Sequence, residues 1–336
     1  MKEETTELTG QELYEVNRGK TADMSGQQFY DYKIKGKGIT SKALLQKDFP
    51  EPNWIIKDLI PEGLTLFCGR PKIGKSWLAL QIASDISVGN PVIGKYENEP
   101  TQVLYLALED TQRRLQGRFN TISGTGSENL CFYTDWSRGE PGIDHLRKRL
   151  ETKEFEHTKL IVIDTLVRFL PQCDFNDYSE IYPLVADIKS IADKHGCAIL
   201  TIHHTRKSGA DDFIDTVSGS NAFAGAADTI LVLQRTRGEV DGFLRAAGRD
   251  IDEKEIALSL EKDKGWLVLG EGVEFRMTRE RRDIVMLLKE ADGPLRANEI
   301  SAMLAKEYGG VRRMLSRMVR DFEICRVGRG QYEAVR

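Results

Sequence analysis

"FCGRPKIGKSWLAL", from Phe67 to Leu80, contains the spacing G-x-x-x-x-G-K-[ST]. The apolar run GLTLFCG before it predicts a strand, and KSWLALQIASDISVG after it predicts an amphipathic helix that ends at Gly89. A strand, a glycine-rich loop and a helix in this order are the context that a phosphate-binding loop requires. The stretch therefore predicts a nucleotide site in a parallel α/β sheet, with an ordinary glycine turn as the alternative.

Each part of this loop has a chemical task. Gly69 and Gly74 permit backbone angles that aim successive N–H groups at phosphate. Lys75 is expected to reach the β- and γ-phosphates, and Ser76 to offer its hydroxyl to Mg²⁺. ATP and Mg²⁺ are therefore the expected cofactors. The predicted nucleotide-binding residues are Gly69, Pro71, Lys72, Ile73, Gly74, Lys75, Ser76 and Trp77.

Acidic residues follow the next predicted strands. QVLYLAL continues into Glu109 and Asp110, and KLIVID ends in Asp164. Open α/β sheets place ligand chemistry at the carboxyl ends of their strands. Glu109 is the candidate for activating the attacking water, and capping of a helix by the acidic pair is the alternative. Asp164 fits the Walker B pattern and is expected to hold Mg²⁺ through water.

The strand AILTIHH ends in a histidine pair, His203 and His204. Such a pair at a strand exit is a candidate sensor of the γ-phosphate, with a histidine packed in the core as the alternative. A long polar segment, TRKSGADDFIDTVSGSNAFAGAAD, follows it. Loops of this length inside a domain are usually functional or mobile. Arg206 and Lys207 are candidates for contact with a DNA backbone, with a solvated loop as the alternative.

The composition excludes several classes of protein. The 336 residues suggest about two domains, and 40% hydrophobic with 30% charged residues is ordinary for a globular chain. Five scattered cysteines without a CxxC pair fit a reduced cytosolic protein and give no zinc or disulfide framework. No apolar run approaches ~18 residues, so a membrane span is not expected. The polar, acidic start of the chain is unlike a signal peptide.

The pattern changes from Thr278 onward. RERRDIVMLLKEA, GPLRANEISAMLAKE and GGVRRMLSRMVRDF predict three helices, and EICRVGRGQYEAV predicts two strands, in the order of a winged helix-turn-helix. Residues 277–336 carry 13 Lys and Arg against 9 Asp and Glu, a net of +4, while the rest of the chain is net −8. This excess points weakly to nucleic acid. A winged helix that binds protein is the alternative.

The third of these helices separates apolar from basic positions. Its apolar residues fall at helical spacing and are expected to face the core: Val311, Met314, Leu315, Met318 and Phe322. Arginines outside this stripe and in the wing are expected to contact DNA phosphates: Arg312, Arg313, Arg317, Arg320, Arg326 and Arg329.

Taken together, five segments resemble the RecA-type P-loop ATPase domain of the plasmid RepA-like hexameric helicase family (AAA_25-like). The resemblance covers roughly 54–261 and lies in EPNWIIKDLIPEGLTLFCGRPKIGKSWLALQIA, VLYLALEDT, KLIVIDTL, ILTIHHTRKSG and SGSNAFAGAADTILVLQR. An acid on the second strand, instead of beside the Walker B acid, separates the RecA class from AAA+ proteins. The resemblance implies that Glu109 is the catalytic glutamate and His204 the γ-phosphate sensor. It also implies a ring, usually a hexamer, with ATP between subunits and DNA through the centre.

One position departs from that family. The plasmid helicase has an arginine finger shortly after the "GS" segment, where this chain has Asp228. The nearest replacements are Arg235, Arg245 and Arg249. Arg249 is the chosen candidate, because related RecA-class rings place trans-acting cations on such a strand; a surface arginine is the alternative.

The expected organisation is a flexible arm over residues 1–42, a RecA-like ATPase domain over 43–275, and a winged-helix DNA-binding domain over 276–336. The expected fold is α/β, with a mainly parallel sheet and antiparallel strands added at one edge.

The expected function is an ATP-hydrolysing, DNA-binding helicase that replicates a mobile element, as a cytoplasmic homo-oligomer. The alternative is an ATP-switched DNA-binding regulator or loader without motor activity. A small-molecule kinase is disfavoured because no substrate lid is apparent.

Overall fold

The structure is a computed structural model of the 336-residue chain. It describes residues 39–122, 126–206, 212–217, 221–235, 241–261, 264–291 and 293–335. The chain divides into two units, Met1–Glu51 and Pro52–Arg336. In the first unit, the short helix α3 (Ser41–Leu45) is capped by Thr40 and buries none of its side chains. Most of the arm predicted over residues 1–42 lies outside the described residues.

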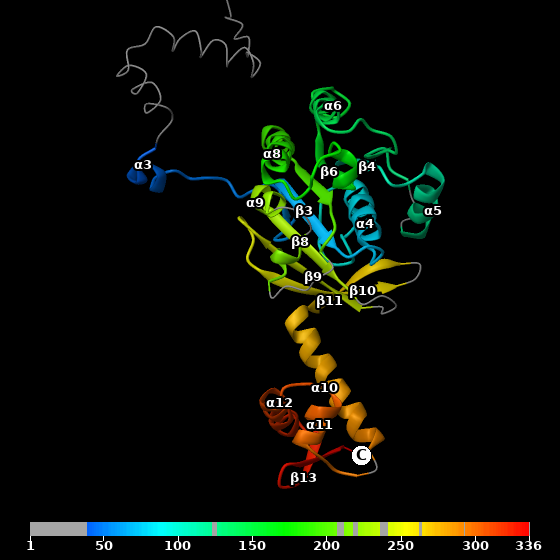
Figure 1. Ribbon diagram of the computed structural model, residues 1–336, viewed down its shortest axis with the longest axis vertical. Coiled ribbons are helices and arrows are strands. Elements are labelled where there is room, and N and C mark those ends of the chain that lie inside the picture. Colours follow the sequence, from blue (N-terminus) through cyan, green and yellow to red (C-terminus); the bar gives the residue numbers. More distant parts are fainter. Residues whose placement is uncertain are drawn as a thin grey trace, which may run out of the picture. The chain divides into compact units, whose positions relative to one another are not determined.

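Within the described part of the second unit, a nine-stranded sheet has the order β11-β10-β9-β8-β3-β7-β6-β4-β5 (Figure 1). The strands from β8 to β5 in this order run parallel, whereas β9, β10 and β11 are antiparallel to their neighbours. The mainly parallel α/β fold with an antiparallel edge is therefore confirmed. The strands are β3 (Gly63–Gly69), β4 (Gln102–Ala107), β5 (Leu130–Tyr133), β6 (Thr158–Asp164), β7 (Ala198–Ile202), β8 (Thr229–Gln234), β9 (Asp241–Gly248), β10 (Lys254–Glu261) and β11 (Gly265–Glu271). A separate short pair is β1 (Trp54–Ile56) with β2 (Ile60–Pro61).

Helices cover both faces of this sheet, which is why its central strands are buried at every position. Successive side chains of a strand point to opposite faces. In β3, Phe67 joins one hydrophobic core with residues of α4 and α5, while Leu66 and Cys68 join the other with residues of α6, α8 and α9. The helices are α4 (Lys75–Val88), α5 (Gln112–Ile122), α6 (Glu140–Leu150), α7 (Leu166–Phe169), α8 (Tyr178–His195) and α9 (Ala222–Ala226), with a 3₁₀ turn at Ile214–Thr216.

Helix α4 is buried on nearly all sides, so the prediction of an amphipathic helix was wrong. The sheet covers one side of it, and α5 and the antiparallel strand β11 pack on others. The polar side chains of Gln81, Ser84 and Ser87 are consequently as buried as its leucines. The predicted end is confirmed, because Gly89 closes the helix in the left-handed conformation at φ 76°.

The C-terminal segment contains the predicted helices and the final strand pair. The second helix is shorter than predicted, because Leu295 and Arg296 pair with the last strand, and Glu299 caps the helix that begins after them. The elements are α10 (Gly272–Glu290), β12 (Leu295–Arg296), α11 (Ala297–Met303), α12 (Tyr308–Arg320), β13 (Ile324–Gly328) and β14 (Gln331–Ala334). No helix within the described ranges has the length and apolar content needed to cross a bilayer.

The predicted core stripe of the third helix is confirmed only in part. Val311, Leu315 and Met318 are buried and Met314 packs against them, whereas Phe322 is 87% exposed. The helix ends at Arg320, and Phe322 adopts φ 59°, which turns its side chain away from the stripe. The helical spacing of apolar residues in the sequence thus continues to Phe322, two residues past the end of the helix.

Candidate nucleotide site and nucleic-acid-facing surface

The phosphate-binding loop joins the carboxyl end of β3 to the amino end of α4. A side chain on Gly69 would lie 2.8 Å from the carbonyl oxygen of Leu233, so the neighbouring strand excludes one. Gly74 caps α4 at φ 107°, a conformation that favours glycine. The two motif glycines are thus needed for close backbone approach and for the turn into the helix. The described loop has the geometry expected for binding phosphate at a helix amino end.

Lys75 is buried and folds back on its own loop. Its Nζ donates to the carbonyl oxygens of Gly69 at 2.7 Å and Arg70 at 2.9 Å. Burial lowers the pKa of Lys75 to about 8, and the carboxylates of Asp164 and Glu109 oppose this change. An anion entering the loop would favour the charged ammonium, so phosphate binding and protonation of Lys75 support each other.

Asp164 ends β6 with a buried carboxylate. Its Oδ2 accepts a 3.1 Å hydrogen bond from the hydroxyl of Tyr105, while Oδ1 has no partner with hydrogen-bonding geometry among the described residues. Burial raises the pKa of Asp164 to about 6, and the Ser76 and Tyr105 hydroxyls stabilise the charged form. An oxygen acceptor left unsatisfied beside a serine hydroxyl fits Mg²⁺, which takes oxygen ligands and keeps several waters. No group of three metal-binding side chains occurs in the part of the chain described here.

The buried charge of Asp164 gives a stability prediction for the protein without nucleotide or metal. Its folded pKa of about 6 exceeds the unfolded value of 3.8. The folded state therefore binds more protons between these values, and the wild type loses stability as pH rises through this window. Asp164→Asn removes the charge but keeps an oxygen for Tyr105. We expect it to unfold at higher urea at pH 7, by about 1–3 kcal/mol, and to show no gain at pH 4.

The control for this experiment is Asp187→Asn, which neutralises an exposed carboxylate on α8. Urea unfolding curves of the three proteins at pH 4, 5, 6 and 7 measure the effect. A variant that gains nothing between pH 4 and 7 would contradict a desolvated Asp164 carboxylate.

Glu109 and Asp110 follow β4, the strand beside β6, and differ in their surroundings. The Glu109 carboxylate is half exposed; its Oε1 accepts a 3.1 Å hydrogen bond from the hydroxyl of Thr165 and lies 3.9 Å from Nε of Arg168. Asp110 is instead held by Arg114 at 3.2 Å and Arg118 at 2.5 Å, with its side chain 9% exposed. Asp110 is therefore a structural anchor, and Glu109 is the carboxylate accessible to a water molecule.

The two histidines occupy different environments. His203 is buried and its ring lies 4.6 Å from that of Phe223. Nδ1 of His204 lies 3.4 Å from Nζ of Lys75. Burial, reinforced by the charge of Lys75, lowers the pKa of His204, so its ring is neutral at pH 7. His204 is thus the member of the pair that lies in the phosphate region, and His203 packs in the core.

Arg249 follows β9 and lies near the start of β8, at the opposite end of the strands from the phosphate loop. Its Nη1 donates to Oδ1 of Asp228 at 2.8 Å, and the same carboxylate accepts from Nζ of Lys189 at 2.5 Å and from the backbone N–H of Leu64 at 3.0 Å. The Arg249 side chain remains 56% exposed. It lines a polar cavity of about 590 Å³ with Asp58, Gly248, Asp250, Ile251, Asp252 and Lys254. Asp228, at the expected position of the finger, therefore holds the candidate cation.

The arginines of α12 are exposed, as predicted. The guanidinium groups of Arg312 and Arg317 have no ion pair or hydrogen-bonding partner among the described residues, and Arg313 is near Glu307. Arg320 pairs with Asp321, while Arg329 is exposed in the turn of the strand pair. In the earlier loop, the backbone N–H of Arg206 bonds to Thr216 at 2.7 Å. Lys207 lies outside the described residues.

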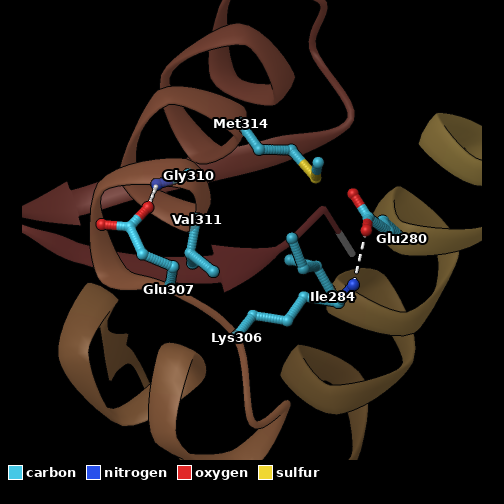
Figure 2. A pocket seen from close by; sticks show the side chains of 7 residues that line it. All are labelled: Glu280, Ile284, Lys306, Glu307, Gly310, Val311 and Met314. Carbon is cyan, nitrogen blue, oxygen red and sulfur yellow. Dashed lines mark hydrogen bonds and ion pairs between the residues drawn. The ribbon is translucent and has the colours of Figure 1, made fainter. Parts of the chain in front are cut away.

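The charged side chains of a groove beside the amino end of α12 are paired with other groups, unlike the exposed arginines. Figure 2 shows Glu280 paired with Lys306 across it, and Glu307 accepting from the backbone N–H of Gly310. Glu307 also accepts from the N–H of Gly309 at 2.8 Å, so its carboxylate occupies the helix amino end. The amino end of α12 is consequently closed to phosphate, so the exposed arginines along the helix are its remaining candidates for contact with a nucleic-acid backbone.

Some site residues were not predicted. Tyr105 and Thr165 contact the two acids, and Arg168 lies beside Glu109. A tyrosine within an otherwise aliphatic strand was a usable signal for Tyr105, and a hydroxyl directly after Asp164 was one for Thr165. The position of Arg168 depends on the turn that follows β6, which the sequence pattern does not specify.

The chain matches a protein family, several curated proteins and solved structures. The family model described as "AAA domain" (AAA_25) matches residues 34–210. DNA repair protein RadA of Listeria monocytogenes is 24% identical over 207 residues, covering 60% of this chain and 40% of RadA. RadA of Streptococcus pyogenes is 23% identical over 309 residues, covering 90% of this chain and 63% of RadA. The chain thus spans less than two thirds of the length of these relatives.

Among solved structures, a DnaB-like replicative helicase matches with a TM-score of 0.51 and 14% sequence identity. The match covers 76% of this chain and 70% of the helicase. At this level of identity the match shows a common fold.

Proposed function

Because the chain belongs to the AAA domain family (AAA_25), we propose that it is an ATP-driven DNA helicase or translocase of the plasmid RepA-like replicative type. Its core is a RecA-like P-loop ATPase. One observation carries the proposal: Lys75, Asp164 and Glu109 meet where β3, β6 and β4 end, with a water-accessible Glu109 on the strand beside Asp164. Binding alone would not need that second, exposed carboxylate.

The residues divide the hydrolysis step among them. N–H groups of the loop and the Lys75 ammonium bind the phosphates, and Ser76 with Asp164 would hold Mg²⁺. Mg²⁺ held by these residues would supply positive charge that offsets the charge developing on the phosphates. Glu109 orients a water and takes its proton, with its carboxylate held by Thr165. His204, whose Nδ1 lies 3.4 Å from Nζ of Lys75, is the proposed sensor of γ-phosphate loss.

We propose that this ATP hydrolysis takes place in a cytoplasmic homo-oligomeric ring, expected to be hexameric, that acts in the replication of a mobile element. Arg249 is the proposed cation supplied to a neighbouring subunit's ATP. Support comes from the RecA-like fold shared with a DnaB-like replicative helicase and from sequence similarity to proteins named for DNA repair. Arginines of the C-terminal segment and of the loop at Arg206 are the proposed DNA contacts, with the segment acting as a winged helix.

A second candidate function is supported by the Asp228 contact. Since Asp228 holds Arg249, the cation needed for fast hydrolysis between subunits is not freely presented. An ATP-switched DNA-binding regulator or loader needs nucleotide-dependent assembly but no rapid turnover. The same site chemistry serves both functions.

Strand displacement measured with ATP, together with the mass of the assembled particle, separates these functions. Unwinding by a ring supports the helicase. ATP hydrolysis without unwinding or translocation supports the switch. If the protein does not hydrolyse ATP, both candidate functions are contradicted, because each assigns ATP hydrolysis to this site.

The proposed DNA surface gives a separate prediction. Alanine at Arg312, Arg313 and Arg317 should weaken double-stranded DNA binding for all sequences alike and reduce the slope of log affinity against log salt by up to about 3. Basal ATP hydrolysis should change little. Fluorescence anisotropy between 50 and 200 mM salt measures the slope, with Arg147→Ala on α6 as the control. An unchanged slope would indicate that α12 binds protein instead.

A further inference from the structure

Two side chains contact the carbonyl groups of the last two loop residues before Lys75, one from strand β11 and one from the segment directly after β8. Nε1 of Trp266, on β11, donates to the carbonyl oxygen of Gly74 at 3.2 Å, beside the helical N–H of Leu78, which donates to the same oxygen at 3.0 Å. Nη1 of Arg235, after β8, lies 3.4 Å from the carbonyl oxygen of Ile73, and its guanidinium lies 5.5 Å from the centre of the Trp266 ring. Residues 192 and 162 positions away along the chain thus converge on two consecutive peptide groups.

Trp266 is itself fixed in place. It is fully buried, and Gln81 of α4 clasps its backbone, accepting from the Trp266 N–H at 2.7 Å and donating to its carbonyl at 2.9 Å. A side chain on Gly74 would lie 2.8 Å from the indole ring. Gly74 therefore serves two needs, a left-handed backbone and room for Trp266. The buried indole ring therefore packs directly against the loop at Gly74.

Peptide geometry converts these contacts into control of phosphate binding. In a trans peptide group the C=O and N–H point in opposite directions. The carbonyl of Ile73 shares its peptide group with the N–H of Gly74, and the carbonyl of Gly74 shares one with the N–H of Lys75. The helical N–H of Leu78 and the Trp266 indole both hold the Gly74 carbonyl, and the Arg235 guanidinium holds the Ile73 carbonyl. The N–H groups of these two peptide groups therefore point the opposite way, toward the phosphate. A hydrogen bond to a carbonyl also polarises the N–H on the other side of the same group.

We infer that Trp266 and Arg235 are positioning residues for the nucleotide, which set the phosphate-facing N–H groups of Gly74 and Lys75. The antiparallel strands thus form part of the nucleotide site. This inference rests on the proposed nucleotide site. It concerns affinity for the β-phosphate, which both ATP and ADP carry, and leaves the hydrolysis step to Glu109.

Trp266→Phe removes the indole donor and retains an aromatic ring. We expect the dissociation constant for Mg-ADP and the KM for ATP to rise about five- to tenfold, the effect of one lost hydrogen bond, with kcat within about twofold of wild type. Trp136→Phe is the matched control, because Nε1 of Trp136 donates to the carbonyl of Gly142 at 3.0 Å, on the other face of the sheet. Calorimetric titration with Mg-ADP provides a readout that does not depend on turnover.

A second pair of variants decides the question if Trp266→Phe does not fold. Arg235→Gln should weaken Mg-ADP about two- to fivefold, since the bond it removes is longer. Arg235→Lys, which keeps a donor, should recover part of the loss. Arg149→Gln is the matched control, because this guanidinium also lies over an aromatic ring, 5.1 Å from the centre of Tyr133.

The outcomes separate this inference from the function on which it rests. If wild type binds Mg-ADP and the Trp266 and Arg235 variants match their controls, the positioning role is wrong and the nucleotide site stands. A fall in kcat at unchanged KM would also overturn it, since that result reports loss of active protein. Failure of wild type to bind Mg-ADP or hydrolyse ATP would overturn the nucleotide site itself.

Discussion

Lys75→Ala is expected to reduce ATP turnover by at least about 10³-fold and to leave the protein folded. The ammonium of Lys75 now donates to two neutral carbonyls of its own loop, at 2.7 and 2.9 Å. A triphosphate offers charged oxygens in the same place, where burial makes each charge–charge contact strong. Without the ammonium, the charge that develops on the transferred phosphoryl group has no partner on this side of the site.

The fold should tolerate this loss because Lys75 carries a cost in the free protein. Burial lowers its pKa to about 8, which means that its charge is disfavoured there. Turnover is measured as phosphate release, and the urea midpoint verifies folding. Hydrolysis at wild-type rates by a folded Lys75→Ala protein would show that the loop is not the site of ATP hydrolysis.

Glu109→Gln should bind ATP normally but slow hydrolysis by about 10²–10⁴-fold. Glutamine keeps the shape of the side chain and an oxygen that can accept the Thr165 hydroxyl, so the loop after β4 retains its contacts. It cannot take a proton from water. Rapid-quench measurement of a single turnover, beside calorimetric ATP binding, separates the chemical step from affinity.

Asp110→Asn is the informative comparison. Asp110 is held by Arg114 and Arg118, so its neutralisation should lower the urea midpoint more than the rate of the chemical step. Normal hydrolysis by Glu109→Gln, with slow hydrolysis by a folded Asp110→Asn, would assign the base to Asp110.

Mixing inactive Glu109→Gln subunits with inactive Arg249→Ala subunits then tests the proposed cation in trans. If Arg249 acts in trans, some interfaces of the mixed assembly will pair the intact Glu109 of an Arg249→Ala subunit with the intact Arg249 of a Glu109→Gln subunit. Those interfaces should recover activity.

Much of the sheet could be predicted because its central strands are short apolar runs, each ending in a polar residue. The phosphate loop and the ends of β4, β6 and β7 follow from this local pattern. Helix α5 and strand β5 were not predicted. β5 is a four-residue edge strand, too short to be distinguished from a loop. In α5, Leu115, Phe119 and Ile122 fall at helical spacing and pack on the core, so its apolar stripe was a usable signal that was missed.

The contacts around the site could not be predicted in the same way. Trp266 meets Gly74 across 192 positions, and its own strand shows only that it is buried. Asp228 is acidic where the resemblance expects a cation, but only the fold reveals that it holds Arg249. Phe322 shows the converse, because the helical period continues in the sequence after the helix has ended.

The sheet also constrains how an assembly could use Arg249. β8 pairs with β3 from Thr229 beside Thr65 to Leu233 beside Gly69, and Arg249 bonds to Asp228 just before the first of these pairs. The proposed cation and the phosphate loop therefore lie at opposite ends of these strands, roughly 13 Å or more apart at ~3.3 Å per residue. A subunit cannot bring its own Arg249 to its own loop across that length, so a neighbour would have to supply it. A two-fold dimer would form both contacts within a single patch, whereas a head-to-tail contact, repeated, closes a ring or extends into a helical filament.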